Sequence, residues 1–275
     1  MVKLLSANFL RLKKDKLFWA AVILMAALGV FFPVRKYLDT LQSHYIENLD
    51  SGFFAWTLFI GVIMAVFCSC FIGTEYSDGT IRNKIVAGQK RGTIYLANLI
   101  VSSAAGIVIC AAYLIPYLCV GIPLFGFFAA DGKLILLTVV TALLLMVAFS
   151  SLFTFIAMIC QSKSAANIIC ILLAFGLLMT AAILNQMLEA PPTHMVYFLD
   201  EDGNMASTEE ANPKYLEGIR REIVQTLYDI LPGGQAIQCA IMTAVHPLRL
   251  PLYSLAIIVL ATGGGCVLFQ KKDLR

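Results

Sequence analysis

Six apolar runs alternate with shorter polar stretches along the chain. They cover residues 17–34, 53–73, 95–119, 134–160, 165–188 and 250–269. Each is about 18 residues or longer, the length at which a helix crosses the hydrocarbon core of a bilayer. A further apolar piece, 120–130, follows the third run. Because Pro116 and Pro123 interrupt this region, we expect it to kink or re-enter rather than to form another span.

The pattern predicts an all-α polytopic membrane protein, organised as a single transmembrane domain over residues 1–275. Hydrophobic residues make up 60% of the chain, charged residues 13%, and the mean hydropathy is +0.83. A soluble domain is about half apolar and a quarter charged. The basic residues are scattered at the ends of apolar runs, which argues against nucleic-acid binding. The eight cysteines lack nearby His, Asp or Glu within the membrane, so we interpret them as packing residues and predict no metal site.

The distribution of Lys and Arg predicts the orientation in the membrane. Thirteen lie on the side that holds both termini and seven on the opposite side, most of these within one long loop. Because cytoplasmic segments are enriched in Lys and Arg, both termini are expected in the cytoplasm of a multi-pass plasma-membrane protein. The loop 74–94 then faces the cytoplasm, and residues 189–249 form the largest external segment.

The first sixteen residues are predicted to form an amphipathic helix at the membrane surface. Its apolar positions recur at helical spacing: Val2, Leu5, Phe9 and Leu12. Such a helix lies among the lipid headgroups with its cations near anionic lipid. A basic segment that only sets topology is the alternative.

The external segment is expected to contain a helix that starts with Asn212 as N-cap and Pro213 as first helical residue. Its apolar stripe consists of Leu216, Ile219, Ile223, Leu227 and Ile230. We expect Pro232-Gly233-Gly234 to end this helix and residues 235–245, too short to span, to dip into the outer leaflet and return. The preceding acidic residues are interpreted as a solvated loop: Asp200, Glu201, Asp202, Glu209 and Glu210.

No Lys, Arg, Asp, Glu or His occupies the middle of an expected span. Ion-coupled carriers usually place ionisable groups there, so this class is disfavoured. The sequence also contains no Walker A, His-Glu-x-x-His or Gly-x-Ser-x-Gly motif, and no catalytic residues are predicted. If the protein moves a substrate, the energy is expected to come from another chain.

The polar stretch 73–95, GTEYSDGTIRNKIVAGQKRGTIY, carries the most specific pattern. Gly73 and Glu75 end the second run, 79–83 reads Gly-Thr-Ile-Arg-Asn, and a basic turn leads into the third run. This stretch resembles the first cytoplasmic loop of permease subunits of type-2 ATP-binding-cassette exporters. Residues 8–19 resemble the family's N-terminal interfacial helix, and Leu-Pro-Gly-Gly-Gln-Ala at 231–236 resembles its external re-entrant element.

The resemblance implies a six-span half-transporter that works with a cytoplasmic ATPase and with a second permease, identical or different. A coupling helix at Ser77–Ala87 would contact the ATPase, which alone would carry ATP and Mg²⁺, so no cofactor is expected in this chain. The residues assigned to coupling are Glu75, Asp78, Gly79, Thr80, Ile81, Arg82, Asn83 and Ile85, and those assigned to an external gate are Pro232, Gly233, Gly234 and Gln235.

Simple chemistry is compatible with the coupling assignment. Gly79 permits a tight turn, Glu75 and Arg82 can pair with each other or with the partner, and Ile81 and Ile85 can offer an apolar contact face. A solvated basic loop that only fixes topology is the alternative.

The leading hypothesis is therefore an exporter permease for an amphipathic or hydrophobic substrate, such as an antimicrobial peptide, a drug or a lipid-like molecule. A membrane binding, sensing or immunity protein that does not transport is the second hypothesis, and an ion-coupled carrier is the third.

Overall fold

The computed structural model describes residues 1–43, 48–199 and 205–272. Within them, six helices are long and apolar enough to cross a membrane. They are α2 (Lys16–Ser43), α4 (Trp56–Ser77), α6 (Arg91–Phe125), α7 (Gly132–Ile159), α8 (Lys163–Leu188) and α11 (Arg249–Lys271). Each covers all or most of one of the expected apolar runs. The all-α polytopic fold is thus confirmed.

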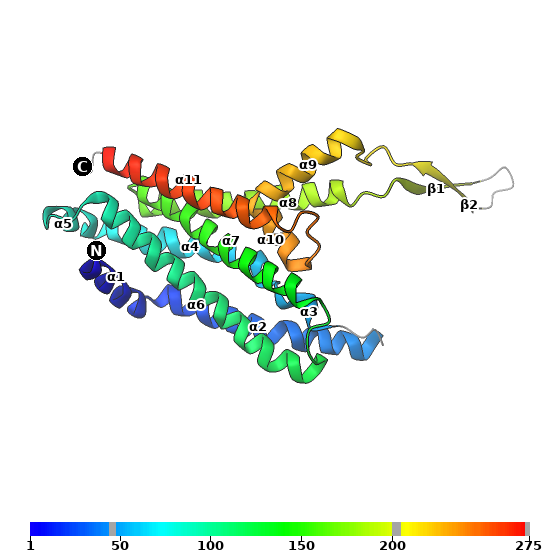
Figure 1. The fold of residues 1–275 in the computed structure, drawn as a ribbon, viewed down its shortest axis with the longest axis horizontal. Coiled ribbons are helices and arrows are strands. Elements are labelled where there is room, and N and C mark those ends of the chain that lie inside the picture. The colour runs from blue at the N-terminus through cyan, green and yellow to red at the C-terminus, as the bar shows by residue number, and fades with distance from the viewer. Residues whose placement is uncertain (44–47, 200–204, 273–275) are drawn as a thin grey trace.

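The six long helices form a bundle around α4, which contacts α6, α7 and α8. On one side α2 packs along α6, and on the other α11 packs along α7 (Figure 1). Gly29 of α2 allows one of these close approaches, because a Cβ at this position would lie 2.4 Å from the Tyr113 carbonyl oxygen. A single large apolar core joins these elements and contains Trp56, Tyr95 and Phe149.

The helix α6 continues through Pro116 and Pro123 to Phe125, so residues 120–125 extend the third span. They form no separate span, as expected, but the expected re-entry is wrong. Prolines are tolerated in membrane helices where neighbouring elements stabilise the backbone. Here Tyr113 and Tyr117 stack at 5.6 Å between ring centroids. Their hydroxyls donate to the Gly52 carbonyl at 2.8 Å and to the Leu49 carbonyl at 3.0 Å. These contacts hold the second half of α6 to the short helix α3 (Asp50–Phe53).

The short elements gather at the two ends of the bundle. One end, called the α5 end, holds α1 (Val2–Lys14), α5 (Thr80–Val86) and the end of α11 (Figure 1). The other, called the hairpin end, holds α3, α9 (Gly218–Ile230), α10 (Pro232–Ile241) and two strands (Figure 1).

The two strands form a hairpin that the sequence analysis did not predict. β1 (Thr193–Leu199) pairs antiparallel with β2 (Met205–Ala211), from Thr193↔Ala211 to Leu199↔Met205. Glu209 and Glu210, expected in a loop, lie exposed on β2. The acidic residues Asp200–Asp202 lie outside the described residues. The hairpin projects away from the bundle (Figure 1).

The expected helix start at Asn212 is also wrong, because α9 begins at Gly218. Asn212 instead closes the base of the hairpin: its Nδ2 donates to the Pro191 carbonyl at 2.9 Å and its Oδ1 accepts from Lys214 N at 3.0 Å. Gly218 then turns the chain with a φ of +54°.

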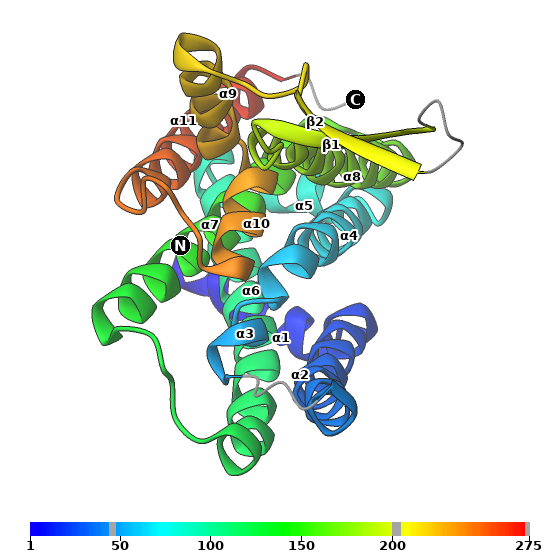
Figure 2. The ribbon, with the colours of Figure 1, turned by 90° about the vertical axis from the view of Figure 1, so that its right-hand side faces the viewer.

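After α9 the chain forms a second short helix, α10, that is packed within the bundle. Pro232 is the first residue of α10, and α10 packs against α4, α7, α8 and α9. Viewed from the hairpin end, α10 lies near the centre of the bundle and α9 lies at its rim beside α11 (Figure 2).

Candidate functional site

The α5 end contains the residues assigned to coupling. After α4 ends at Ser77, Gly79 reverses the chain with a φ of +67°, a conformation that favours glycine. The seven-residue helix α5 follows, and Gly88 ends it with a φ of +79°. The expected coupling helix at 77–87 is therefore present as a helix over Thr80–Val86.

The inner face of α5 is packed against this chain. Ile81 is 2% exposed, and Ile85 is partly buried against the main core. The expectation that these two isoleucines offer a contact face to a partner is wrong. They anchor α5 to the bundle instead.

Below α5, a buried carboxylate joins four helices. Glu75 is 1% exposed, and its Oε1 accepts from Lys84 Nζ of α5. Lys84 Nζ also donates to Asn8 Oδ1 of α1 at 3.0 Å. Asn8 Nδ2 donates to Asn98 Oδ1 of α6 at 2.6 Å, and Asn98 Nδ2 donates to Glu75 Oε2 at 2.9 Å. These four side chains close a hydrogen-bonded ring, in which each charge and amide has a partner.

Arg11 of α1 adds a second cation to the same carboxylate. It donates through Nη1 to Glu75 Oε1 and stacks its guanidinium 3.7 Å from the centre of the Phe71 ring. Burial lowers the pKa of Lys84 and of Arg11, while the Glu75 charge opposes this shift in both. We call Asn8, Arg11, Glu75, Lys84 and Asn98 the Glu75 network.

Arg82 does not take part in this network, in contrast to the expected pairing with Glu75. Its exposed side chain lies on the outer face of α5 with Asn83 and Val86, and Val86 is 83% exposed. Asp78 is exposed beside this face, and Thr80 begins the helix half-buried.

A cavity of about 270 Å³ opens next to Arg82. Tyr76, Ser77, Gly79 and Gln161 contribute to its lining, with Glu75 and Ile81 at the inner side. The outer face of α5 thus combines an exposed apolar side chain, a cation and a neighbouring cavity, and another protein can contact all three.

At the hairpin end, the four residues assigned to a gate are all buried in α10 or at its start. A Cβ at Gly233 would lie 2.2 Å from the Leu177 carbonyl oxygen, and one at Gly234 would lie 1.9 Å from the Tyr228 carbonyl oxygen. Gln235 Nε2 donates to the Asp229 carbonyl at 2.9 Å, and its Oε1 accepts from Ser254 at 2.5 Å. Pro232 and the glycines therefore allow α10 to sit against α8 and α9 without intervening side chains.

Sequence reasoning missed Asn8, Arg11, Lys84 and Asn98 as partners of Glu75, and Val86 as the exposed apolar residue. One signal was present. Asn8 and Arg11 are three apart and share a helix face, so a polar side chain of another element could have been expected opposite them. Their separation from Glu75 along the chain, 64 residues for Arg11, hid which element that would be.

A protein-family model described as ABC-2 family transporter protein matches residues 4–187. The match spans α1 to the end of α8 and so includes the Glu75 network and α5. No curated protein matches the chain. Because the family model covers about two thirds of the sequence, the chain is a member of the ABC-2 family of transporter membrane proteins.

Proposed function

We propose that this protein is the permease subunit of an ATP-driven exporter and that the outer face of α5 is its contact with a separate ATPase. Membrane proteins of this family work with an ATP-binding subunit. In this proposal, ATP and Mg²⁺ are bound by the partner. The main support for this proposal is that the two faces of α5 differ. Ile81 and the Glu75 network anchor one face, while Arg82, Asn83 and Val86 are exposed on the other.

The Glu75 network gives α5 a mechanical connection to the bundle. Lys84 links α5 to α4 through Glu75 and to α1 through Asn8, and Asn98 extends the same ring to α6. A force applied to α5 would reach three helices through hydrogen bonds that are shielded from water. Such bonds are stronger than exposed ones, because the local dielectric is low.

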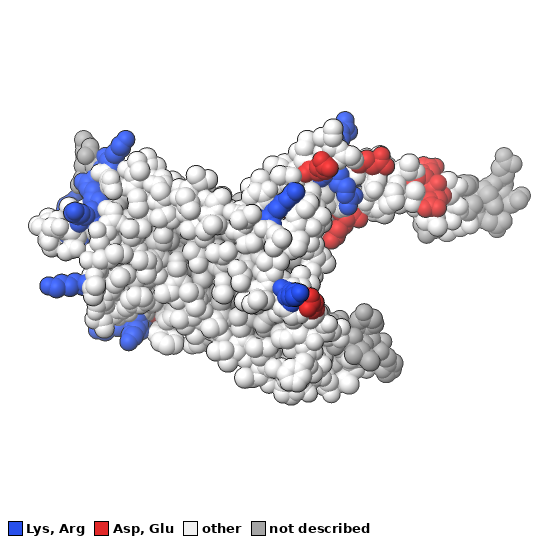
Figure 3. Space-filling model, in the orientation of Figure 1, with Lys and Arg blue, Asp and Glu red and all other residues white. Residues whose placement is uncertain are grey.

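The charge distribution supports placing α5 in the cytoplasm. On the face shown in Figure 3, Lys and Arg gather at the α5 end, whereas most Asp and Glu lie toward the hairpin end. This asymmetry matches the positive-inside rule for membrane proteins. An ATPase supplied with cellular ATP would meet α5 on that side.

The substrate we favour is amphipathic or hydrophobic: an antimicrobial peptide, a drug or a lipid-like molecule. The middle of the six long helices carries no Lys, Arg, Asp, Glu or His, so the bundle offers little to stabilise a bare ion. A second permease, as a copy of this chain or a different one, would complete the pathway against an exposed apolar surface of the bundle such as that of α2.

The experiment is affinity purification of the tagged chain from its native membrane after mild crosslinking, with mass spectrometry of the proteins recovered. The proposal expects a stoichiometric protein with a Walker A motif. Val86→Asp and Arg82→Glu should each remove it, while the control Lys13→Glu, an exposed cation of α1, should retain it. Recovery of the chain without any ATPase would favour a membrane sensing or immunity protein and overturn the proposal.

A further inference from the structure

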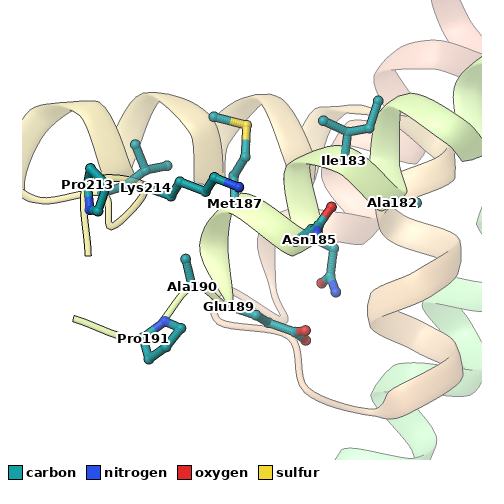
Figure 4. A pocket seen from close by; sticks show the side chains of 11 residues that line it. Ala182, Ile183, Asn185, Met187, Glu189, Ala190, Pro191, Pro213 and Lys214 are labelled. Atoms are coloured by element: carbon teal, nitrogen blue, oxygen red, sulfur yellow. The ribbon is translucent and has the colours of Figure 1, made fainter. Parts of the chain in front are cut away.

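We propose that a cavity at the hairpin end of α8 binds the headgroup of a zwitterionic membrane phospholipid, with Lys214 facing the phosphate and Glu189 facing the ammonium group. The cavity measures about 660 Å³. It lies between the last turns of α8 and the segments that flank the hairpin, and Figure 4 shows the side chains that line it. The ligand and the site are independent of the ATPase contact.

The position of the cavity matches the headgroup layer. Ile183 and Met187 line it and belong to the exposed, lipid-facing side of α8, which ends at Leu188. The apolar part of a spanning helix ends where the hydrocarbon core ends, so the residues just beyond α8 lie among headgroups.

The neighbouring helix α9 also indicates that the cavity lies at the level of the lipid headgroups. Its apolar stripe is exposed and consists of Ile219, Ile223, Leu227 and Ile230. These residues share one face of a 13-residue helix whose other face contacts α8 and α10. A helix of this kind at the rim of a membrane protein lies along the bilayer interface. This exposed apolar stripe next to the end of α8 supports a position of the cavity beside lipid.

The cavity is lined by one cation and one anion, which are complementary to the two charges of a zwitterionic headgroup. Lys214 and Glu189 both line the cavity, one from the segment after β2 and the other from the end of α8 (Figure 4). Asn185 and Gln186 add amide groups to the lining. A lysine ammonium binds phosphate through charge-assisted hydrogen bonds, and a carboxylate binds an ammonium group in the same way.

The scaffold holds these groups in place. Lys214 N donates to Asn212 Oδ1 at 3.0 Å, which fixes the turn that carries the lysine. Arg221 Nη2 donates to the Leu188 carbonyl at 3.1 Å, and Tyr228 OH donates to Asn185 Oδ1 at 2.9 Å. The end of α8 is thus fixed by α9. With one cation and one anion, the site favours a zwitterionic headgroup over an anionic one.

The test is lipid retention measured by native mass spectrometry. The delipidated protein is mixed with equal amounts of phosphatidylethanolamine and phosphatidylglycerol, and the lipid bound to each chain is counted. Wild type should retain one phosphatidylethanolamine in preference to phosphatidylglycerol. Lys214→Gln should lower its retention about tenfold, the effect of losing one charge-assisted contact. Glu189→Gln should abolish the preference while retaining phosphatidylglycerol.

The matched controls are Lys133→Gln and Glu210→Gln, which remove exposed charges at the hairpin end outside the cavity. Both should behave like wild type. Equal retention by wild type and by the two cavity variants, or equal losses in the controls, would overturn the proposal. All four residues have exposed side chains or line the open cavity, so thermal stability should be unchanged and can be checked in the same samples.

Discussion

Lys84 Nζ lies 3.0 Å from Asn8 Oδ1, although 76 residues separate the two along the chain. The contact joins α5 to α1, and Glu75 joins both to α4. The helix α5 is therefore not an independent surface element, because Lys84 on its inner side belongs to a buried ring of hydrogen-bonded side chains. Substitutions inside the ring and substitutions on the outer face of α5 should have different consequences.

Glu75→Gln should destabilise the protein by about 3 kcal/mol, because it leaves two partly buried cations without a counter-charge. Thermal unfolding of the purified protein measures this effect. Asp78→Asn is the control, since it removes an exposed carboxylate three residues away and should change the unfolding temperature little.

The loss should be partly recovered when Lys84→Gln is combined with Glu75→Gln, because one of the two unpaired cations is then removed as well. A double-mutant cycle over these two positions should give a coupling energy of at least about 1 kcal/mol. Additive effects of the two substitutions would show that the ion pair does not stabilise the fold.

Gly79→Ala should cost about 1 kcal/mol, because the residue has a φ of +67° and no atom lies within 4 Å of the added Cβ. The loss would be purely conformational, and Gly79→Asn should be milder, since Asn adopts this conformation more readily. Gly132→Ala, which also meets no neighbouring atom but has no positive φ, serves as the control. An unfolding temperature for Gly79→Ala that is equal to or higher than that for Gly132→Ala would contradict this expectation.

Gly233→Ala should displace α10, because the added methyl group would lie 2.2 Å from the Leu177 carbonyl oxygen. Overpacking of this kind typically costs about 1–3 kcal/mol. Cys239 is buried in α10, so its labelling by a thiol reagent, followed by peptide mass spectrometry, reports the displacement. Gly176→Ala in α8 meets no atom within 4 Å and should leave Cys239 protected. Unchanged labelling of Cys239 in Gly233→Ala would mean that α10 tolerates the extra volume.

Asp229→Ala should be more destabilising than His246→Ala. Asp229 is buried, and its carboxylate accepts from Gln225 at 2.8 Å and from Gln238 at 3.1 Å, while its other oxygen lies 3.1 Å from His246 Nδ1. Removing the carboxylate leaves the buried Gln238 amide without its acceptor, at a cost of about 1–3 kcal/mol. His246 is partly exposed and can bond to water instead. Denaturation of the two variants side by side should give this order, and the reverse order would contradict it.

The spanning helices could be predicted from the sequence because a bilayer requires long apolar runs whatever the neighbouring helices do. The turn at Gly79 could also be predicted, since only a local backbone property was needed. The inward direction of Ile81 could not. The spacing of two isoleucines on a short helix shows only that they share a face. Whether that face is buried in this chain or contacts another protein depends on where the bundle lies.

The hairpin and the start of α9 were missed for a related reason. Asn212 and Pro213 have the local chemistry of a helix start, but the Asn212 side chain bonds across the hairpin base to Pro191. The strand β2 carries mostly polar residues that are exposed on both faces where described, so no apolar alternation indicated it. The partners of Glu75 were hidden because they come from three other helices.

The position of α10 also has a consequence for how the protein is made. Thr57 Oγ1 of α4 donates to the Ala236 carbonyl of α10 at 2.7 Å, and Ala236 leaves the ribosome 179 residues after Thr57. Ser254 of α11, which bonds to Gln235, is synthesised later still. Until α10 has been synthesised, the surfaces of α4, α7 and α8 that it covers lack their partner within this chain. The interior of the bundle is therefore completed by a short helix that is synthesised just before the last span.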